Sequence, residues 1–186
     1  MNVRVIFSHG HLSSPDSTKI QRLAPLARQR GFAVEAIDYR DQRDDPLGRI
    51  KRLSDRLAEL DEVPVLVGSS LGGIVSVAAA ERHPVAGLFL LAPALYLEDR
   101  LPEMTVRETY QPQAQHIAVV HGWHDDIIPW QHSLRFANSS SAALHLVDAG
   151  HQLGECLPTI AVLFEDFLAG YPSLPASEAD STPGSA

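Results

Sequence analysis

Residues 63–80 read VPVLVGSSLGGIVSVAAA, an apolar run followed by a turn of small residues and a second apolar run. The first run is short and rich in valine, which predicts a buried strand, and the second predicts a helix that begins near Leu71. A strand that passes into a helix across one sharp turn is typical of a parallel α/β fold.

The same alternation of short apolar runs with segments of helical period extends along most of the chain. We predict six strands, at Val3–Ser8, Phe32–Ile37, Val63–Gly68, Ala86–Leu91, His116–His121 and Leu144–Val147. We predict helices at Ser17–Arg30, Pro46–Leu60, Leu71–Arg82, Trp130–Asn138 and Glu155–Leu168. Because the strands are apolar nearly throughout, both faces of their sheet must be covered. The sequence therefore predicts an α/β domain with a doubly wound, mostly parallel six-stranded sheet and helices on both faces.

Length and composition favour one domain. The chain has 186 residues, of which 45% are hydrophobic, enough for a single core. Residues 171–186 consist mainly of Pro, Ser, Ala, Gly and acids, which bury too little apolar surface to order a segment. We therefore predict a domain over residues 1–170 and a flexible C-terminal tail over residues 171–186.

Charge and apolar patterning exclude several classes of partner. The formal net charge of −8 argues against binding nucleic acid, and the most apolar stretch, Val85–Leu97, is too short to span a membrane. Basic residues between Arg22 and Arg56 alternate with acids, which predicts solvated helix faces. The single cysteine, Cys156, excludes an intrachain disulfide, and the first residues lack a signal-peptide pattern. We expect a soluble, cytoplasmic protein, and the sequence leaves its oligomeric state open.

The turn at residues 68–72 has the pattern Gly-x-Ser-x-Gly, with Ser70 at its centre. Such a turn holds a serine outward between strand and helix, where only small flanking residues fit. The helix that follows directs its first N–H groups and its positive dipole end toward the same point, which favours developing negative charge. Centring the pattern on Ser69 would require glycine at positions 67 and 71. Ser70 is therefore the predicted nucleophile.

A serine hydroxyl needs a base, and the chain offers nine histidines. His151 follows the last strand on a loop at the carboxyl edge of the predicted sheet, which places it near Ser70. The loop after the preceding strand carries Asp125, which would orient the histidine and gives the chain order nucleophile, acid, histidine. Asp126 is the second choice for the acid, and Asp148 is a weaker one because it lies only three residues before the histidine.

A tetrahedral intermediate also requires N–H donors for its oxyanion. The N–H of Leu71, directly after the nucleophile, is one candidate. The glycine-containing turn after the first strand supplies His11 as the second candidate, provided that the first and third strands are neighbours. In that arrangement the strand order reverses between them, which leaves a crevice at their carboxyl ends.

These motifs together resemble the α/β-hydrolase superfamily, in particular its small, lidless, esterase-like bacterial members. The resemblance covers residues 3–168 and lies in His9-Gly10, Gly68–Gly73, His121–Asp125 and Gly150-His151. It implies a Ser70, Asp125, His151 triad, an oxyanion hole at His11 and Leu71, an acyl-enzyme and no metal or other cofactor. The chain lacks the first two strands usual in this superfamily, and only residues 92–115 stand where larger relatives insert a lid.

Without a large lid, the site should accept small or accessible substrates. A shallow apolar wall could come from Trp123, Trp130, Ile127, Leu95, Tyr96 and Leu153, although core packing explains each of them equally well. The predicted function is cleavage of carboxylic esters or thioesters, with a small-molecule substrate and no nucleic-acid or membrane partner. Ester, thioester and amide substrates share one mechanism, so the sequence does not separate them.

Two other functions remain open at this point. The fold also occurs in proteins that bind ligands without catalysis. A metallohydrolase would use His9, His11, His121, His124 and Asp125 as ligands, because two pairs of histidines fall near one crevice. The serine turn would have no role in that alternative.

Overall fold

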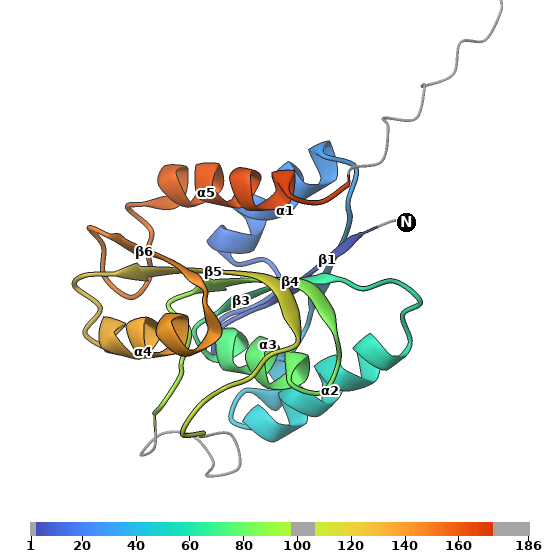
Figure 1. The fold of residues 1–186 in the computed structure, drawn as a ribbon, viewed down its shortest axis with the longest axis horizontal. Coiled ribbons are helices and arrows are strands. Elements are labelled where there is room, and N and C mark those ends of the chain that lie inside the picture. The colour runs from blue at the N-terminus through green and yellow to red at the C-terminus, as the bar shows by residue number, and fades with distance from the viewer. Residues whose placement is uncertain (1–2, 98–106, 173–186) are drawn as a thin grey trace, which may run out of the picture.

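Parallel strands form the centre of the protein, in a computed structural model that describes residues 3–97 and 107–172 (Figure 1). The strands in the described residues are β1 (Arg4–Ser8), β2 (Ala33–Ile37), β3 (Val65–Ser69), β4 (Val85–Leu91), β5 (Ala114–Gly122) and β6 (Ala143–Val147). Each lies within two residues of a predicted strand at either end. β3 and β4 are buried almost throughout, as expected for strands covered on both faces.

The strand order is β2-β1-β3-β4-β5-β6, and every neighbouring pair is parallel. The chain runs outward from β1 to β2 and then returns to place β3 on the other side of β1. The carboxyl ends of β1 and β3 therefore diverge at a topological switch point, where open α/β sheets bind ligands. Ser8 pairs with Gly68 there, so the turns that follow the two strands begin side by side.

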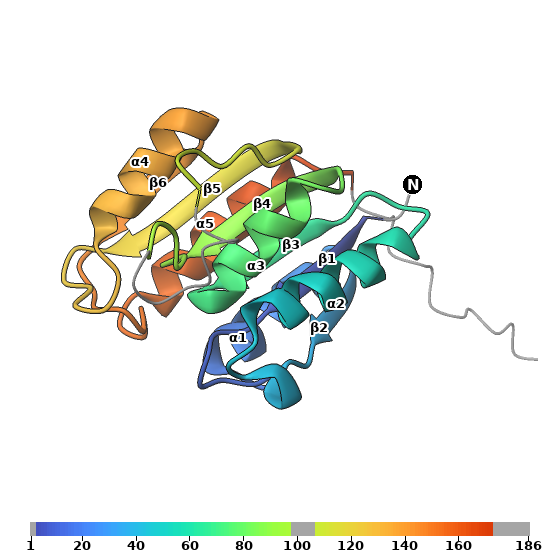
Figure 2. The same cartoon turned by 90° about the horizontal axis from the view of Figure 1, so that it is seen from below.

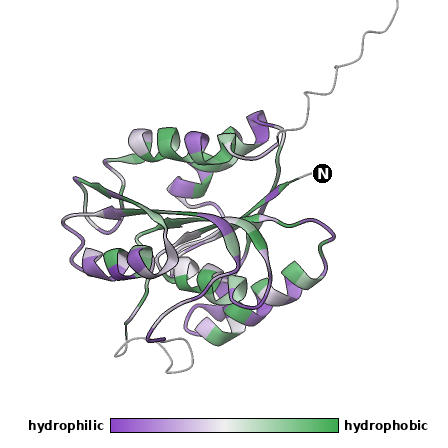
Figure 3. Cartoon of the chain, in the orientation of Figure 1, coloured by the Kyte–Doolittle hydropathy of each residue, from purple (hydrophilic) through white to green (hydrophobic). Residues whose placement is uncertain are grey.

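Helices cover both faces of the sheet, which confirms the predicted doubly wound α/β class (Figures 1 and 2). Helices α1 (Thr18–Gln29) and α5 (Leu157–Ala169) lie together on one face, and α2 (Pro46–Ala58), α3 (Leu71–Ala80) and α4 (Trp130–Ser140) lie on the other. Every residue of α3 is buried, and Figure 3 colours this helix hydrophobic or neutral, whereas α1 and α2 mix both kinds of residue. A short 3-10 helix, Arg40–Gln42, was not predicted.

The predicted helix boundaries have visible physical causes. The Ser17 side chain accepts the N–H of Ile20 and so caps α1, and the Asp45 side chain accepts the N–H of Gly48 at the start of α2. Pro46 occupies the first position of α2, where the helix requires no N–H donor.

One residue on a helix face contradicts the prediction of solvation. Arg49 of α2 is completely buried, because its guanidinium turns inward against the turn after β1. The other basic residues of α2 have at least part of their side chains in solvent, including Arg52 and Arg56.

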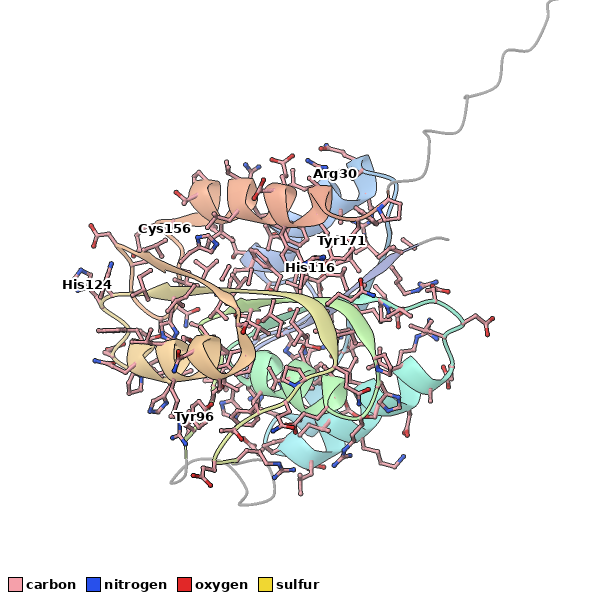
Figure 4. The ribbon with its side chains drawn as sticks, in the orientation of Figure 1. Arg30, Tyr96, His116, His124, Cys156 and Tyr171 are labelled. Carbon is pink, nitrogen blue, oxygen red and sulfur yellow. The ribbon has the colours of Figure 1, made fainter. Side chains whose placement is uncertain are left out.

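At the C-terminal end, Tyr171 belongs to the fold and not to a tail. Its ring packs against Phe167 and His116, and its hydroxyl donates to the carbonyl oxygen of Ala86 at 3.2 Å (Figure 4). Residues 173–186, the rest of the predicted tail, lie outside the described residues, as do residues 98–106 of the segment in which no large lid is expected. None of the helices in the described residues has the length and apolar character needed to cross a membrane.

Candidate active site

Ser70 occupies the sharp turn between β3 and α3 with φ 51° and ψ −118°, a conformation that L-residues rarely adopt. Its N–H donates to Leu91 O at 2.9 Å and its carbonyl oxygen accepts the N–H of Ala94 at 3.0 Å, so the segment after β4 holds the turn. Glycine is required on both sides. A Cβ at Gly68 would lie 2.5 Å from Gly72 O, and one at Gly72 would lie 2.0 Å from Ser8 O.

Three side chains from three loops meet at this turn. The Ser70 hydroxyl lies 3.0 Å from Nε2 of His151, and Nδ1 of the same ring lies 2.8 Å from Oδ2 of Asp125. Because a carboxylate only accepts, Nδ1 carries a proton, and in the neutral ring Nε2 is then free to accept the serine proton. The structure brings together the three residues that the sequence singled out.

The Asp125 side chain is completely buried and fully hydrogen-bonded. Its Oδ1 accepts the N–H groups of Ile127 and Ile128 at 2.9 and 2.8 Å, and its Oδ2 accepts from His151 and His121. Burial alone would raise the pKa of this carboxyl, but the hydrogen bonds from both imidazoles and both backbone N–H groups outweigh it and hold the pKa well below its usual range.

Backbone hydrogen bonds join the loops that carry the aspartate and the histidine. The N–H of Trp123 donates to Val147 O at 2.9 Å, and the N–H of His124 donates to Ala149 O at 3.0 Å. The two loops approach so closely at Gly122 that a Cβ there would lie 2.1 Å from Ala149 O. The separation of Asp125 and His151 is thus fixed by the ends of β5 and β6.

The alternative acids occupy other positions. Asp126 is exposed, next to Asp125 but on the solvent side of the loop. Asp148 pairs with His124 at 2.9 Å, and both side chains are mostly in solvent at the periphery of the molecule (Figure 4).

A pocket of about 480 Å³ opens over Ser70 at the switch point. It is lined by Ser70, His151, Gly10 and His11, together with Leu12 and Ile127 at its rim. Gly10 packs against the nucleophile turn, since a Cβ there would lie 3.5 Å from the Cβ of Ser70. Leu71 is the first residue of α3, so its N–H has no acceptor within the helix. Of the two residues expected to form the oxyanion hole, Leu71 thus directly follows Ser70 and His11 lines the same pocket.

Most residues of the expected apolar wall lie outside the pocket over Ser70. Leu95, Tyr96 and Leu153 are buried in the two cores and lie outside the pocket lining. Tyr96 packs edge-on against Tyr110 and His132, because the segment after β4 folds back beneath α4 (Figure 4). Trp123 is 47% exposed and contacts the ring of Trp130 outside the pocket. Ile127 alone of the six residues expected to form the apolar wall lines the pocket.

Sequence reasoning missed a role for His121, the second imidazole on Asp125. This side chain is completely buried, with Nε2 3.0 Å from Asp125 Oδ2 and Nδ1 2.7 Å from the hydroxyl of Ser133. A histidine at the end of a buried strand, four residues before a proposed triad acid, was the available signal.

The histidines considered as metal ligands form hydrogen bonds to different partners. His9 is buried, and its Nε2 accepts the N–H of Tyr39 while its Nδ1 donates to Gly10 O. His11 pairs with Asp44, and His124 pairs with Asp148. Across the described ranges 3–97 and 107–172, no group of three or more His, Cys, Asp or Glu side chains is arranged to hold a metal ion.

The arrangement is suited to nucleophilic acyl transfer. A hydroxyl, an unprotonated ring nitrogen and a buried carboxylate are hydrogen-bonded in series, and a helix N-terminus adjoins the hydroxyl. The pocket above them gives an acyl substrate access to the same oxygen.

Comparisons with known proteins place the chain in a family. A family model described as "Uncharacterised protein family (UPF0227)" matches residues 4–126. No curated protein matches the sequence.

Solved structures include one relative at more than 30% identity and others that share the fold. A protein of the alpha/beta hydrolase superfamily from Xanthomonas campestris pv. campestris is 32% identical, with a TM-score of 0.79 over 91% of this chain and 100% of that chain. Mouse alpha/beta hydrolase domain-containing protein 10 is 21% identical, with a TM-score of 0.77 over 89% of each chain. Est1E from Butyrivibrio proteoclasticus is 17% identical, with a TM-score of 0.74 over 91% of this chain and 88% of that chain. The last two likenesses concern the fold alone.

Proposed function

The chain belongs to the UPF0227 family and to the alpha/beta hydrolase superfamily, and from that premise we propose that it is a serine hydrolase acting through an acyl-enzyme on Ser70. Its substrates are small or accessible carboxylic esters or thioesters. The observation that carries this proposal is the unbroken series of hydrogen bonds from the Ser70 hydroxyl through His151 to the buried Asp125.

The reaction begins when Nε2 of His151 accepts the Ser70 proton as the serine oxygen attacks the substrate carbonyl carbon. The carbonyl π electrons move onto the oxygen and give a tetrahedral oxyanion. When this intermediate collapses, the imidazolium gives its proton to the leaving alcohol or thiol, and the acyl group remains on Ser70. A water molecule then attacks the acyl-enzyme and loses a proton to His151. When the second tetrahedral intermediate collapses, the bond between the acyl carbon and the Ser70 oxygen breaks, the imidazolium returns its proton to that oxygen, and the carboxylic acid leaves.

Two further groups serve charge and orientation. Asp125 is ionised and completely buried beside His151, so it stabilises the imidazolium that forms in each step. The N–H groups of Leu71 and His11 are the proposed donors to the oxyanion, because both residues adjoin Ser70 at the switch point.

The test compares ester hydrolysis by the wild type with Ser70→Ala, using the neighbouring Ser69→Ala as a matched control. With 4-nitrophenyl acetate and an acetyl thioester, we expect Ser70→Ala to lower kcat by about 10⁴-fold or more and Ser69→Ala to keep most of it. Activity should persist in the presence of a chelator.

Other outcomes would favour the other functions. A folded Ser70→Ala protein with wild-type rates would refute the proposal, and loss of activity on chelation would point to a metallohydrolase. A folded wild type that binds acyl ligands but turns over none would support a non-catalytic binding protein.

A further inference from the structure

Arg49 is a buried cation whose hydrogen bonds all go to the main chain. All five N–H donors of a guanidinium have acceptors here, since Nε reaches Gln42 O at 2.8 Å and Nη2 reaches Arg43 O at 3.2 Å and His11 O at 3.4 Å. Its Nη1 donates to His9 O at 3.3 Å and to Gly10 O at 3.2 Å. The guanidinium also lies over the Tyr39 ring.

Three of these carbonyls belong to consecutive residues of the turn after β1, which lines the pocket over Ser70. The His9 side chain holds the same turn from a second direction. Its Nδ1 donates to Gly10 O at 2.8 Å, and its Nε2 accepts the N–H of Tyr39 at 3.0 Å. These two bonds require one neutral tautomer, and burial lowers the pKa of His9, which favours that neutral ring.

The Gly10 carbonyl thus receives two side-chain donors, one from His9 and one from Arg49. This carbonyl and the N–H of His11 belong to the same peptide group. Because that group is planar and trans, the two bonds point in opposite directions. Drawing the carbonyl toward Arg49 therefore turns the His11 N–H away from Arg49. Gly10, which belongs to the same peptide group, approaches Ser70, since a Cβ there would lie 3.5 Å from the Cβ of Ser70.

We propose that Arg49 and His9 are positioning residues that aim the His11 amide at the oxyanion formed on Ser70. This inference rests on the proposed acyl-enzyme mechanism. It gives a role to two buried polar residues that are not part of the triad. Arg49 also places a positive charge behind the peptide group, which polarises the N–H that would stabilise the oxyanion.

Lysine at position 49 would keep the charge but lose the planar fork that reaches several carbonyls at once. We expect Arg49→Lys to lower kcat about 10-fold and Arg49→Met about 100-fold, with KM nearly unchanged, because the oxyanion is absent from the bound substrate and develops only in the tetrahedral intermediate and its transition states. Arg56→Met is the matched control, since Arg56 lies two turns along α2 and pairs with Glu35 and Glu59. This control should keep kcat within about twofold.

Rates are expressed per competent site, by titrating Ser70 with a fluorophosphonate, so that a loss of folded protein is not counted as a loss of rate. Affinity for phenylboronic acid, which forms a tetrahedral adduct with a serine oxygen, should fall in parallel with kcat/KM. Unchanged rate per site and unchanged boronate affinity in Arg49→Lys and Arg49→Met would overturn the proposal.

His9 provides a pair of variants that do not disturb Arg49. Asparagine can place an amide N–H where Nδ1 lies, whereas glutamine reaches the position of Nε2 and leaves Gly10 O without that donor. We expect His9→Asn to keep kcat within about threefold and His9→Gln to lose about 10-fold or more. Equal activity of the two folded variants would contradict the proposal, and this pair decides the question if the Arg49 variants do not fold.

A double-mutant cycle locates the effect. His11→Pro removes the amide N–H, so adding Arg49→Lys to it should cost no further activity. Full additivity would overturn the proposal while leaving the serine mechanism intact. If Ser70→Ala were as active as the wild type, the proposed function itself would fail, so the two failures are distinguishable.

Discussion

At the scale of single residues, the low pKa of Asp125 bears on the pH dependence expected of the proposed site. The four hydrogen-bond donors to Asp125 hold its pKa well below the usual range, so it remains ionised down to low pH. We therefore expect Asp125 to add no ionisation to the acid limb of kcat/KM, so that the loss of activity on acidification follows the uptake of a single proton. The test is the profile of kcat/KM between about pH 4 and 9. An acid limb whose slope requires the uptake of two protons would contradict this expectation.

The exposed neighbour provides a matched test of which aspartate acts. Asp125→Asn should lower kcat by about 10³ to 10⁴-fold, because an amide stabilises the imidazolium poorly and favours the wrong tautomer. Asp126→Asn, which changes an exposed side chain, should stay within about threefold of the wild type. Comparable losses in the two variants would count against the assignment of Asp125.

The same carboxylate affects stability. Its pKa is lower in the folded protein than in the unfolded chain, so its stabilisation is present above about pH 4 and is lost as the pH falls further. Chemical denaturation between about pH 2 and 6 should show a steeper acid loss of unfolding free energy in the wild type than in Asp125→Asn. Parallel curves for the two proteins would contradict the low pKa.

Site residues that stand in a local sequence pattern could be predicted, whereas residues whose role depends on partners far away in the sequence could not. Ser70 is marked by the small residues beside it, and His151 and Asp125 are marked by their places after strands. Arg49 resembles any basic residue on an amphipathic helix, because nothing in the sequence reveals the carbonyls of a turn about forty residues away. His121 differs from Arg49, because its place four residues before Asp125 was a signal in the sequence, although its contact with Ser133 was not.

At the scale of elements, the turn between β3 and α3 sets the position of Ser70, the proposed nucleophile. Gly72 lets α3 approach β1 so closely that a methyl group there would overlap the Ser8 carbonyl. We expect Gly72→Ala to lower the free energy of unfolding by about 1–3 kcal/mol and to reduce kcat per folded molecule at least about tenfold.

Gly170→Ala is the control, because a Cβ there meets its nearest neighbour at an ordinary 3.6 Å and the backbone is helical. It should change stability by less than about 0.5 kcal/mol. Equal losses of stability in the two variants, measured by thermal unfolding, would contradict the requirement for glycine by close packing at the turn between β3 and α3.

Strands and helices could be predicted to within about two residues, because their apolar periods reflect burial on both faces of the sheet. The loops could not. Leu95 and Tyr96 follow β4 on the edge of the sheet that carries the site, yet they turn into the core beneath α4. Whether a loop residue lines a pocket or fills a core depends on the path of the backbone, which apolar character does not reveal.

At the scale of the whole molecule, three large apolar side chains line the pocket at the switch point, those of Leu12, Ile127 and Leu157. Leu12 and Ile127 are 76% and 44% exposed, so much of their apolar surface faces solvent. Burying one methylene group of a substrate's acyl chain contributes about 0.8 kcal/mol of binding free energy. This gain ends once the chain extends beyond the apolar surface of the pocket.

We therefore expect kcat/KM for nitrophenyl esters to rise over the first few acyl carbons and then level. Leu12→Ala should reduce that rise. Leu134→Ala is the control, because Leu134 is also exposed but lies on α4, outside the pocket, and this substitution should leave the rise unchanged. A steady increase to long acyl chains would contradict a small or accessible substrate.

The C-terminal end of the described fold is part of the core. The Tyr171 hydroxyl lies over Gly87, where a Cβ would meet it at 2.0 Å, and burial raises the pKa of this phenol. Tyr171→Phe should cost about 1 kcal/mol for the lost hydrogen bond, and Tyr171→Ala about 3 kcal/mol or more for the cavity. Denaturant unfolding of both variants checks this, and a stable Tyr171→Ala protein would contradict the packing.

Mass mapping of a covalent adduct tests the acyl-enzyme proposal most directly. The native protein is treated with a fluorophosphonate, which loses fluoride as it bonds to an activated serine oxygen, and is then digested. We expect one equivalent of label, on the peptide that contains Ser70, with none in Ser70→Ala and little in His151→Ala. A native protein that hydrolyses esters while Ser70 stays unlabelled, or while another residue takes the label, would contradict the mechanism.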